Sequence, residues 1–77
     1  MKARGILARN IRRLRAERGL SQEKLGFEAR LSMTSISNIE REKYAATVDA
    51  IGRIAAALDI PMSELLIEKP RSLRAKK

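Results

Sequence analysis

The chain contains no cysteine and no histidine, and each absence excludes a class of chemistry. Without cysteine there is no disulfide and no thiolate nucleophile, and without histidine the usual general base and metal ligand are missing. A chain of 77 residues also leaves little room for a catalytic pocket, although Ser21–Lys24 matches the Ser-x-x-Lys pattern of one enzyme class. We therefore expect no enzyme, no catalytic residue, no metal, no cofactor and no small-molecule ligand.

Large aromatic side chains and long apolar runs are also scarce. There is one Phe, one Tyr and no Trp, so the 44% of hydrophobic residues must build the aliphatic core of one small domain. The apolar run Ile6–Ala8 is too short for a signal peptide, and no stretch approaches the roughly 18 apolar residues of a membrane-spanning helix. A reducing compartment suits a chain without disulfides. We expect a cytoplasmic protein that does not bind membranes.

Positive charge is what the chain has in excess. There are 17 Lys and Arg residues against 9 Asp and Glu, which gives a net charge of +8. Residues 1–18 carry +6 and residues 69–77 carry +5, whereas residues 19–68 carry −3. Basic ends around a balanced middle indicate contact with a polyanion, of which nucleic acid is the commonest. An anionic membrane is the competing polyanion, so a membrane-active cationic peptide is one alternative function.

Apolar residues recur every three or four positions, and strand-like alternation is nearly absent, which predicts an all-α fold with five helices. The first helix is expected from about Arg4 to Arg18, followed by a left-handed cap at Gly19. Its core stripe contains Leu7, Ala8, Ile11 and Leu14. The arginines that we expect to coat its solvent face are Arg9, Arg12 and Arg13.

Two helix caps then follow one another closely. Ser21 has the side chain of an N-cap and precedes a second helix over about 22–29. Ser32 is an equivalent cap for a third helix over 33–41, after a connection of only two residues. Two short helices joined by so tight a turn predict a helix-turn-helix arrangement.

Two more helices complete the expected domain. Thr47 should cap a fourth helix over 48–58, and Pro61 suits the first turn of a fifth helix that ends near Ile67. The core stripe of the fourth helix contains Val48, Ile51, Ile54, Ala55 and Leu58. We therefore expect one domain over residues 4–67, followed by a basic and flexible C-terminal tail over residues 68–77.

Several segments together resemble the phage Cro/cI-type (XRE-like) helix-turn-helix regulators, over about residues 6–67. The segments that carry the resemblance are Ile11–Arg15, Gly19–Leu25, Ile36–Arg41, Ile54–Leu58 and Ser63–Leu66. The resemblance implies a lambda-repressor-like fold of five helices, and a repressor or a restriction–modification controller protein as the function. Two positions depart from it, because Arg30 and Glu42 stand where the family usually has glycine. A left-handed backbone costs a non-glycine residue about 1–2 kcal/mol. These departures therefore put the geometry of the two turns in doubt, but not the fold.

The third helix should carry the residues that read DNA. With Ile36 inward and about 100° per residue, Ile39 and Glu40 fall on the inner side and a small polar face points outward. In a major groove, Asn pairs with adenine and Thr contacts a base edge or a thymine methyl. The expected DNA contacts are Gln22, Met33, Thr34, Ser37, Asn38, Arg41 and Lys43. Gln22, Arg41 and Lys43 should mainly bind phosphates, and Met33 stays open between core filler and base contact.

A structural ion pair is expected behind that face. Arg15 lies four residues after Ile11 on the core stripe of the first helix, and Glu40 lies four after Ile36 on the third. Two opposite charges directed at one interior should meet, because a lone buried charge is costly. The resembled family carries an Arg–Glu pair at these two positions. The alternative is that the two side chains reach solvent separately.

The leading hypothesis is a transcriptional regulator whose partners are a double-stranded DNA operator and a second copy of itself. One such domain reads few base pairs, so a homodimer on a palindrome is the usual route to specificity. The fifth helix is apolar on more faces than one small core requires, which suggests a dimer contact there. The expected dimer residues are Ile60, Met62, Leu66 and Ile67. The alternative is an antitoxin-type regulator that also binds a protein partner.

Overall fold

The computed structural model of the protein describes residues 3–68. Five helices follow one another within that range, and none of those residues forms a strand. The helices are α1 (Ala3–Glu17), α2 (Gln22–Ala29), α3 (Met33–Glu40), α4 (Val48–Ala57) and α5 (Met62–Leu65). The prediction of an all-α fold with five helices is confirmed. The expected basic tail, apart from Glu68, lies outside the described residues.

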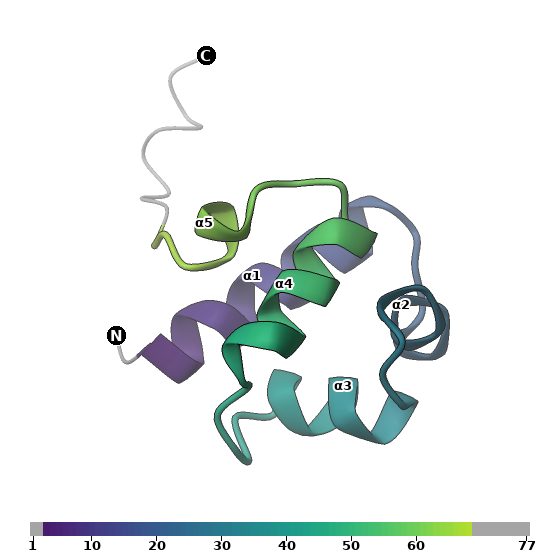
Figure 1. The fold of residues 1–77 in the computed structure, drawn as a ribbon, viewed down its shortest axis with the longest axis horizontal. Helices are drawn as coiled ribbons and strands as arrows, with labels where there is room; N and C mark the ends of the chain where they lie inside the picture. Colours follow the sequence, from purple (N-terminus) through teal and green to yellow (C-terminus); the bar gives the residue numbers. More distant parts are fainter. Residues whose placement is uncertain (1–2, 69–77) are drawn as a thin grey trace.

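Figure 1 shows how the helices surround a common centre. α3 lies along one side of the molecule, α5 lies on the opposite side, and α2 closes one end between them. Helix contacts join α2 to α3 and α4, α1 to α3 and α5, and α4 to α5. α1 is therefore the element that touches both α3 and α5. Within residues 3–68, no helix has the length and the apolar character needed to cross a membrane.

Hydroxyl side chains cap the starts of three helices. The Oγ of Ser21 accepts a hydrogen bond from the backbone amide three residues later, at 2.9 Å. Ser32 and Thr47 do the same at 2.9 Å and 3.0 Å. Each cap satisfies one of the four amides that a helix start leaves without an intrahelical partner. The predicted starts of α2, α3 and α4 are confirmed.

An aliphatic core lies between the helices. Its members are Leu7, Ile11, Leu14, Leu25, Ala29, Ile36, Ile39, Ile51, Ile54, Ala55, Leu58 and Leu65. The predicted core stripe of α1 is confirmed, but one member of the α4 stripe is wrong, because Val48 is 72% exposed. The first turn of α4 extends beyond the core, which begins on this helix only at Ile51.

The fifth helix is shorter than the sequence pattern predicts. Pro61 is its N-cap, with φ −66° and ψ 147°, and is not part of the first turn. The helix ends at Leu65, and the predicted end near Ile67 is wrong. The reason is a contact from α1, because the Asn10 amide binds the carbonyls of Leu65 and Ile67. α1, α3 and α4 each end one residue earlier than predicted, a difference within the usual fraying of helix ends.

Left-handed backbone turns end several of the helices. Gly19 has φ 66°, as predicted, and Arg30, Glu42 and Asp59 have φ of 61°, 60° and 59°. The turns at Arg30 and Glu42 thus keep the geometry that the resembled family achieves with glycine. The strain of a left-handed non-glycine residue is about 1–2 kcal/mol at each position.

The turn from α2 into α3 depends on Gly26. A Cβ on this residue would stand 2.6 Å from the carbonyl oxygen of Leu31 and 3.3 Å from backbone atoms of Ser32. The Leu31 amide donates to the Gly26 carbonyl at 2.8 Å, which closes the turn. Glycine therefore allows the backbone leaving α2 to fold tightly against it, and this sets where α3 begins.

Candidate nucleic-acid interface

α3 has a closed inner face and an open outer face. Ile36 and Ile39 are buried in the core on the inner side. On the outer side Thr34 is exposed, and Ser37 and Asn38 are half-buried. The side chains of these three outer residues form no hydrogen bond to any described residue. Their polar atoms are therefore available to an external partner.

Met33 lies at the start of α3, directly after the Ser32 cap. Its side chain is 52% exposed, and it is not a member of the core. Met33 therefore does not fill the core, and a base contact stays as the predicted role. An exposed thioether beside Thr34 adds a flexible apolar group to the outer face of α3.

The loop after α3 holds basic side chains close to the end of that helix. The Arg41 amide donates to the Ser37 carbonyl at 2.9 Å, and the Lys43 amide donates to the Asn38 carbonyl at 2.9 Å. Both Arg41 and Lys43 are exposed. Tyr44, which the sequence reasoning did not select, is 40% exposed in the same loop. The sequence feature that could have identified Tyr44 is its position, as an aromatic residue directly after Lys43.

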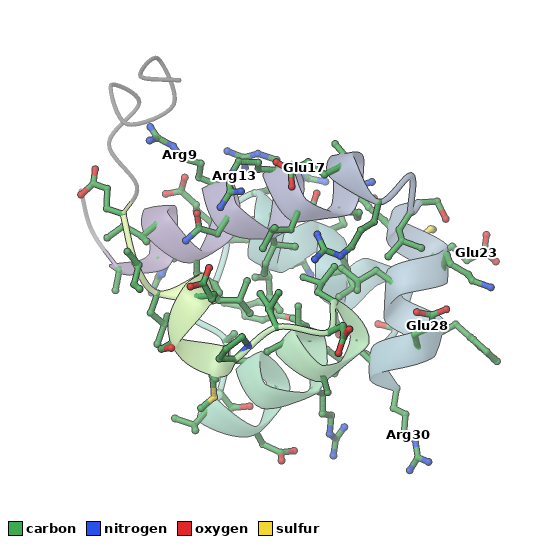
Figure 2. The ribbon with its side chains drawn as sticks, turned by 90° about the horizontal axis from the view of Figure 1, so that it is seen from above. Arg9, Arg13, Glu17, Glu23, Glu28 and Arg30 are labelled. Carbon is green, nitrogen blue, oxygen red and sulfur yellow. The ribbon has the colours of Figure 1, made fainter. Side chains whose placement is uncertain are left out.

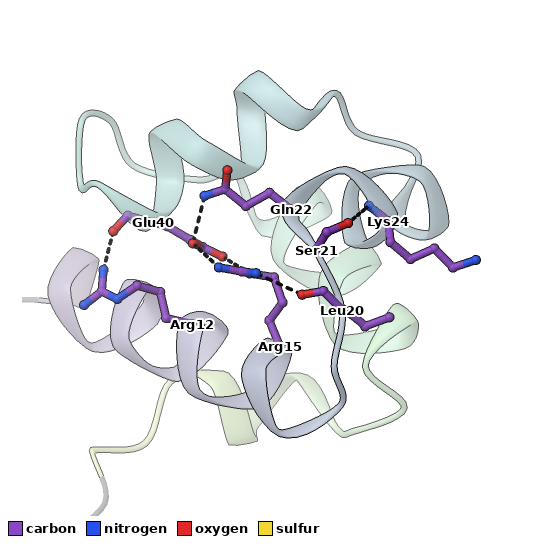
Figure 3. A network of polar contacts seen from close by, with 7 residues as sticks. All are labelled: Arg12, Arg15, Leu20, Ser21, Gln22, Lys24 and Glu40. Atoms are coloured by element: carbon purple, nitrogen blue, oxygen red, sulfur yellow. Dashed lines mark hydrogen bonds and ion pairs between the residues drawn. The ribbon is translucent and has the colours of Figure 1, made fainter.

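Behind α3, the Glu40 carboxylate is the centre of a polar network (Figure 3). Arg15 donates to it through Nε at 2.7 Å and through Nη2 at 3.1 Å, so the guanidinium binds both carboxylate oxygens. The side chain of Glu40 is 3% exposed and that of Arg15 is 22% exposed. The expected Arg–Glu pair is thus present, and two parallel bonds of this kind are the strong form of the interaction.

The same network includes Gln22, the first residue of α2. Its Nε2 donates to Oε1 of Glu40 at 3.1 Å. Figure 3 shows the amide oxygen of Gln22 pointing away from the carboxylate. The start of α2 and the end of α3 are therefore linked through Glu40, and Gln22 retains its side-chain oxygen and its backbone amide for other contacts.

Arg12 has a role that the sequence did not predict. Its side chain reaches the main-chain carbonyl of Glu40, the last residue of α3, and Nη1 donates to that oxygen (Figure 3). A cation at the carboxyl end of a helix is favoured by the helix dipole. Arg12 is exposed, as expected, and it also binds the end of α3 to α1.

Several other charged side chains of α1 and α2 reach solvent. Figure 2 shows Arg9 and Arg13 on the outer side of α1, and Arg13 pairs with Glu17 at 3.5 Å. Glu23 and Glu28 project from α2 into solvent in the same view. The outer face of α3, by contrast, carries no acidic side chain. The outer face of α3 therefore offers no negative charge to repel a polyanion, and the exposed Arg41 and Lys43 follow it in the chain.

A separate apolar surface covers parts of α4 and α5. Val48 is 72%, Met62 37%, Leu66 46% and Ile67 46% exposed. Val48 and Gly52 are one turn apart on α4, and the Met62 sulfur lies 3.7 Å from where a Cβ on Gly52 would stand. We call Val48, Gly52, Met62 and Leu66 the α4–α5 surface. Of the four expected dimer residues, Ile60 is half-buried against the core and the other three are exposed.

Comparison with known proteins identifies the arrangement. A family model described as helix-turn-helix matches residues 11–65, which include the whole of α2, α3, α4 and α5. The chain belongs to this family, in its XRE-like branch of Cro/cI type. The resemblance read from the sequence is confirmed, and the protein is a DNA-binding transcription regulator.

The similar proteins include transcription factors and controller proteins. A hypothetical transcription factor from Neisseria meningitidis is 34% identical over 71 residues, which are 92% of this chain and 67% of that protein. Control protein C.BamHI from Bacillus amyloliquefaciens is 38% identical over 62 residues, 79% of this chain and 76% of its own length. The crystal structure of the Neisseria transcription factor NHTF matches with a TM-score of 0.85 at 35% identity, covering 97% of this chain and 84% of that one. The restriction–modification controller C.AhdI from Aeromonas hydrophila matches with a TM-score of 0.78 at 34% identity, covering 80% and 94%.

Proposed function

We propose that the protein regulates transcription by binding a palindromic operator as a homodimer, with α3 in the major groove. The observation that carries the proposal is the contrast between the two faces of α3. Its inner face is fixed by the core and by the Glu40 network, whereas the side chains of Thr34 and Asn38 on its outer face form no hydrogen bond to a described residue. The small polar side chains on this face can form their hydrogen bonds with base edges in the major groove.

Recognition then divides into base contacts and phosphate contacts. Thr34, Ser37 and Asn38 contact base edges, and Met33 contributes an apolar contact at the rim, such as one to a thymine methyl. Arg41, Lys43 and the start of α2 at Gln22 contact phosphates, because helix ends and loops reach the DNA backbone. The first group sets sequence preference and the second sets position and overall affinity.

The second copy is proposed to dock on the α4–α5 surface. Gly52 supports this position, because glycine within a helix costs about 1 kcal/mol relative to alanine. No internal contact requires it, since a Cβ there would meet only the Met62 sulfur, at an ordinary 3.7 Å. A glycine beside the exposed Val48 and Met62 instead allows another helix to approach closely. Leu66 and Ile67 extend the contact at the end of α5, and Ile60, which packs against the core, supports it from the interior.

The DNA upstream of the protein's own gene is the first target to test. C.BamHI is named a control protein and C.AhdI a restriction–modification controller, so the upstream DNA of any neighbouring restriction or methyltransferase gene is the second. Footprinting should show an inverted repeat with half-sites about one helical turn apart. Sedimentation of the complex should give two protomers on each site. One protomer on a symmetric site would contradict the homodimer.

Two variants test the proposed dimer surface without DNA. Val48→Glu should weaken dimerisation in analytical ultracentrifugation and leave the monomer folded, because an acid in the first turn of a helix suits its dipole. Leu66→Glu should weaken both dimerisation and operator binding, although Leu66 also lines a groove with Leu7 and Ile51. Arg9→Glu, on the outer side of α1, is the matched control and should leave dimerisation unchanged. A dimer that tolerates both Val48→Glu and Leu66→Glu would place the contact elsewhere.

A regulator that also binds a protein, as an antitoxin does, is the second candidate function. The observation that favours it is Phe27, which is 79% exposed on α2 beside a shallow groove lined by Ser21, Glu23 and Lys24. The test is co-purification with the product of the adjacent gene, using the native chain and Phe27→Ser. Loss of the partner with operator affinity retained supports this role, and equal capture by both chains removes Phe27 from it.

A further inference from the structure

The carboxyl end of α5 requires support from elsewhere in the fold. The helix has only four residues, and Pro61 gives it no side-chain cap. A single turn of helix is unstable alone, because nucleation fixes several residues for very few hydrogen bonds. Its last carbonyls also have no intrahelical donor. The orientation of Leu66 and Ile67, which leave this end and are each 46% exposed, depends on what satisfies those carbonyls.

Asn10 of α1 supplies that support. Its side chain is buried, at 2% exposure, and its Nδ2 donates to the carbonyl of Leu65 at 2.8 Å and to that of Ile67 at 3.0 Å. The Glu64 carbonyl lies at 3.5 Å from the same nitrogen. A carboxamide has two N–H donors, so both are used to hold the segment that follows α5. The sequence reasoning did not select Asn10, because its partners lie more than 50 residues away.

The other end of the amide is held as well. Oδ1 of Asn10 accepts from Nη2 of Arg13 at 3.3 Å, and Arg13 in turn pairs with Glu17 at 3.5 Å. With its oxygen turned to Arg13, the amide keeps its nitrogen on the α5 carbonyls. A buried asparagine is costly unless its polar atoms are paired, and here both ends are.

We propose that Asn10 is a positioning residue for the dimer contact, which holds Leu66 and Ile67 in the orientation that a second copy recognises. The inference rests on the proposed homodimer and deepens it. A contact surface that is already ordered loses less conformational entropy on association. Without the Asn10 amide, the segment after Leu65 would have to be ordered during dimerisation, and the affinity between protomers would fall.

The experiment compares dimer affinity, folding and local order in the full chain. Asn10→Asp keeps the shape of the side chain and removes both donors, and Asn10→Leu replaces it with an apolar group of similar size. Sedimentation measures the dimer dissociation constant, circular dichroism the folded fraction, and hydrogen exchange the protection of residues 64–67. We expect the dissociation constant to rise about tenfold in both variants, with faster exchange confined to those residues and unchanged affinity for a duplex carrying a single half-site.

Further variants separate the possible outcomes. Arg13→Met leaves Asn10 in place but frees its oxygen, and should weaken the dimer by a smaller factor, so it tests the inference even if the Asn10 variants do not fold. Val48→Glu should weaken the dimer without faster exchange at residues 64–67. Unchanged dimer affinity in every folded Asn10 and Arg13 variant overturns the inference and leaves the proposed dimer standing. A native chain that is monomeric at all concentrations and on a symmetric operator overturns the proposed dimer, and the inference with it.

Discussion

Replacement of Arg15 by methionine should destabilise the fold, because it removes the main partner of a buried carboxylate. Glu40 is 3% exposed and receives two bonds from Arg15, at 2.7 Å and 3.1 Å, and one from Gln22 at 3.1 Å. After Arg15→Met the neutral amide of Gln22 is the one donor left to the carboxylate among the described residues, because Arg12 binds the main-chain carbonyl of Glu40 instead. Methionine retains most of the volume of the arginine stem, so the change tests charge more than packing.

The magnitude follows from the burial of the pair. Breaking a fully buried pair costs about 3–5 kcal/mol, because the remaining charge is left without compensation. The Arg15 side chain is 22% exposed, so water can enter and solvate Glu40 in part. We therefore expect a loss near the lower limit, about 3 kcal/mol in the free energy of unfolding. For a domain of this size, that corresponds to a fall of roughly 12–24 °C in the melting temperature.

Urea and thermal unfolding, followed by circular dichroism, measure this loss in a double-mutant cycle. Arg15→Met, Glu40→Leu and the double variant are compared with the native chain. The double variant should be more stable than Arg15→Met alone, because it leaves no unpaired carboxylate in the interior. Lys24→Met, which breaks the exposed pair with Glu28 on α2, is the control and should cost less than about 1 kcal/mol. A loss below 1 kcal/mol for Arg15→Met, or strictly additive losses, would refute the reasoning.

Three further substitutions test the turns and the surface of α4. Gly26→Ala should lower the free energy of unfolding by about 1–3 kcal/mol in urea titrations, because its Cβ would stand 2.6 Å from the Leu31 carbonyl oxygen. An unchanged stability would contradict the requirement for glycine at this close backbone approach. Arg30→Gly should raise the free energy of unfolding by about 1 kcal/mol, because φ is 61° there, and a loss of stability would show that Arg30 is not strained. Gly52→Ala should stabilise the monomer by about 1 kcal/mol and still weaken the dimer in sedimentation, whereas a tighter dimer would exclude close approach at Gly52.

Local patterns were sufficient to predict the starts of α2, α3 and α4 and the left-handed cap at Gly19. Each cap at Ser21, Ser32 and Thr47 depends on an amide only three residues away, so the signal is contained in a short segment. The pairing of Arg15 with Glu40 was also accessible, because helical periodicity places both side chains on inner faces. The resemblance to a known family supported the same positions independently.

The features that the sequence did not predict depend on contacts between the ends of different helices. Val48 fits the periodicity of the α4 stripe, but its burial would need a neighbour that the core does not provide at that end. Arg12 fits a solvent face of α1, yet its side chain is long enough to reach the last carbonyl of α3. Asn10 ends α5 from a position 55 residues before Leu65. No periodicity within one helix can report contacts of this kind.

The central claim is that the outer face of α3 reads the operator, and a paired titration tests it most directly. Asn38→Ala and Lys43→Ala are each titrated against the operator and a scrambled duplex at two salt concentrations. Asn38→Ala should cost about 1–3 kcal/mol on the operator and little on scrambled DNA, because it removes a base contact. Lys43→Ala should weaken both complexes similarly and reduce the salt slope by about one, because it removes a phosphate contact. Equal losses on both duplexes for Asn38→Ala and for Thr34→Ala would show that α3 does not read the sequence.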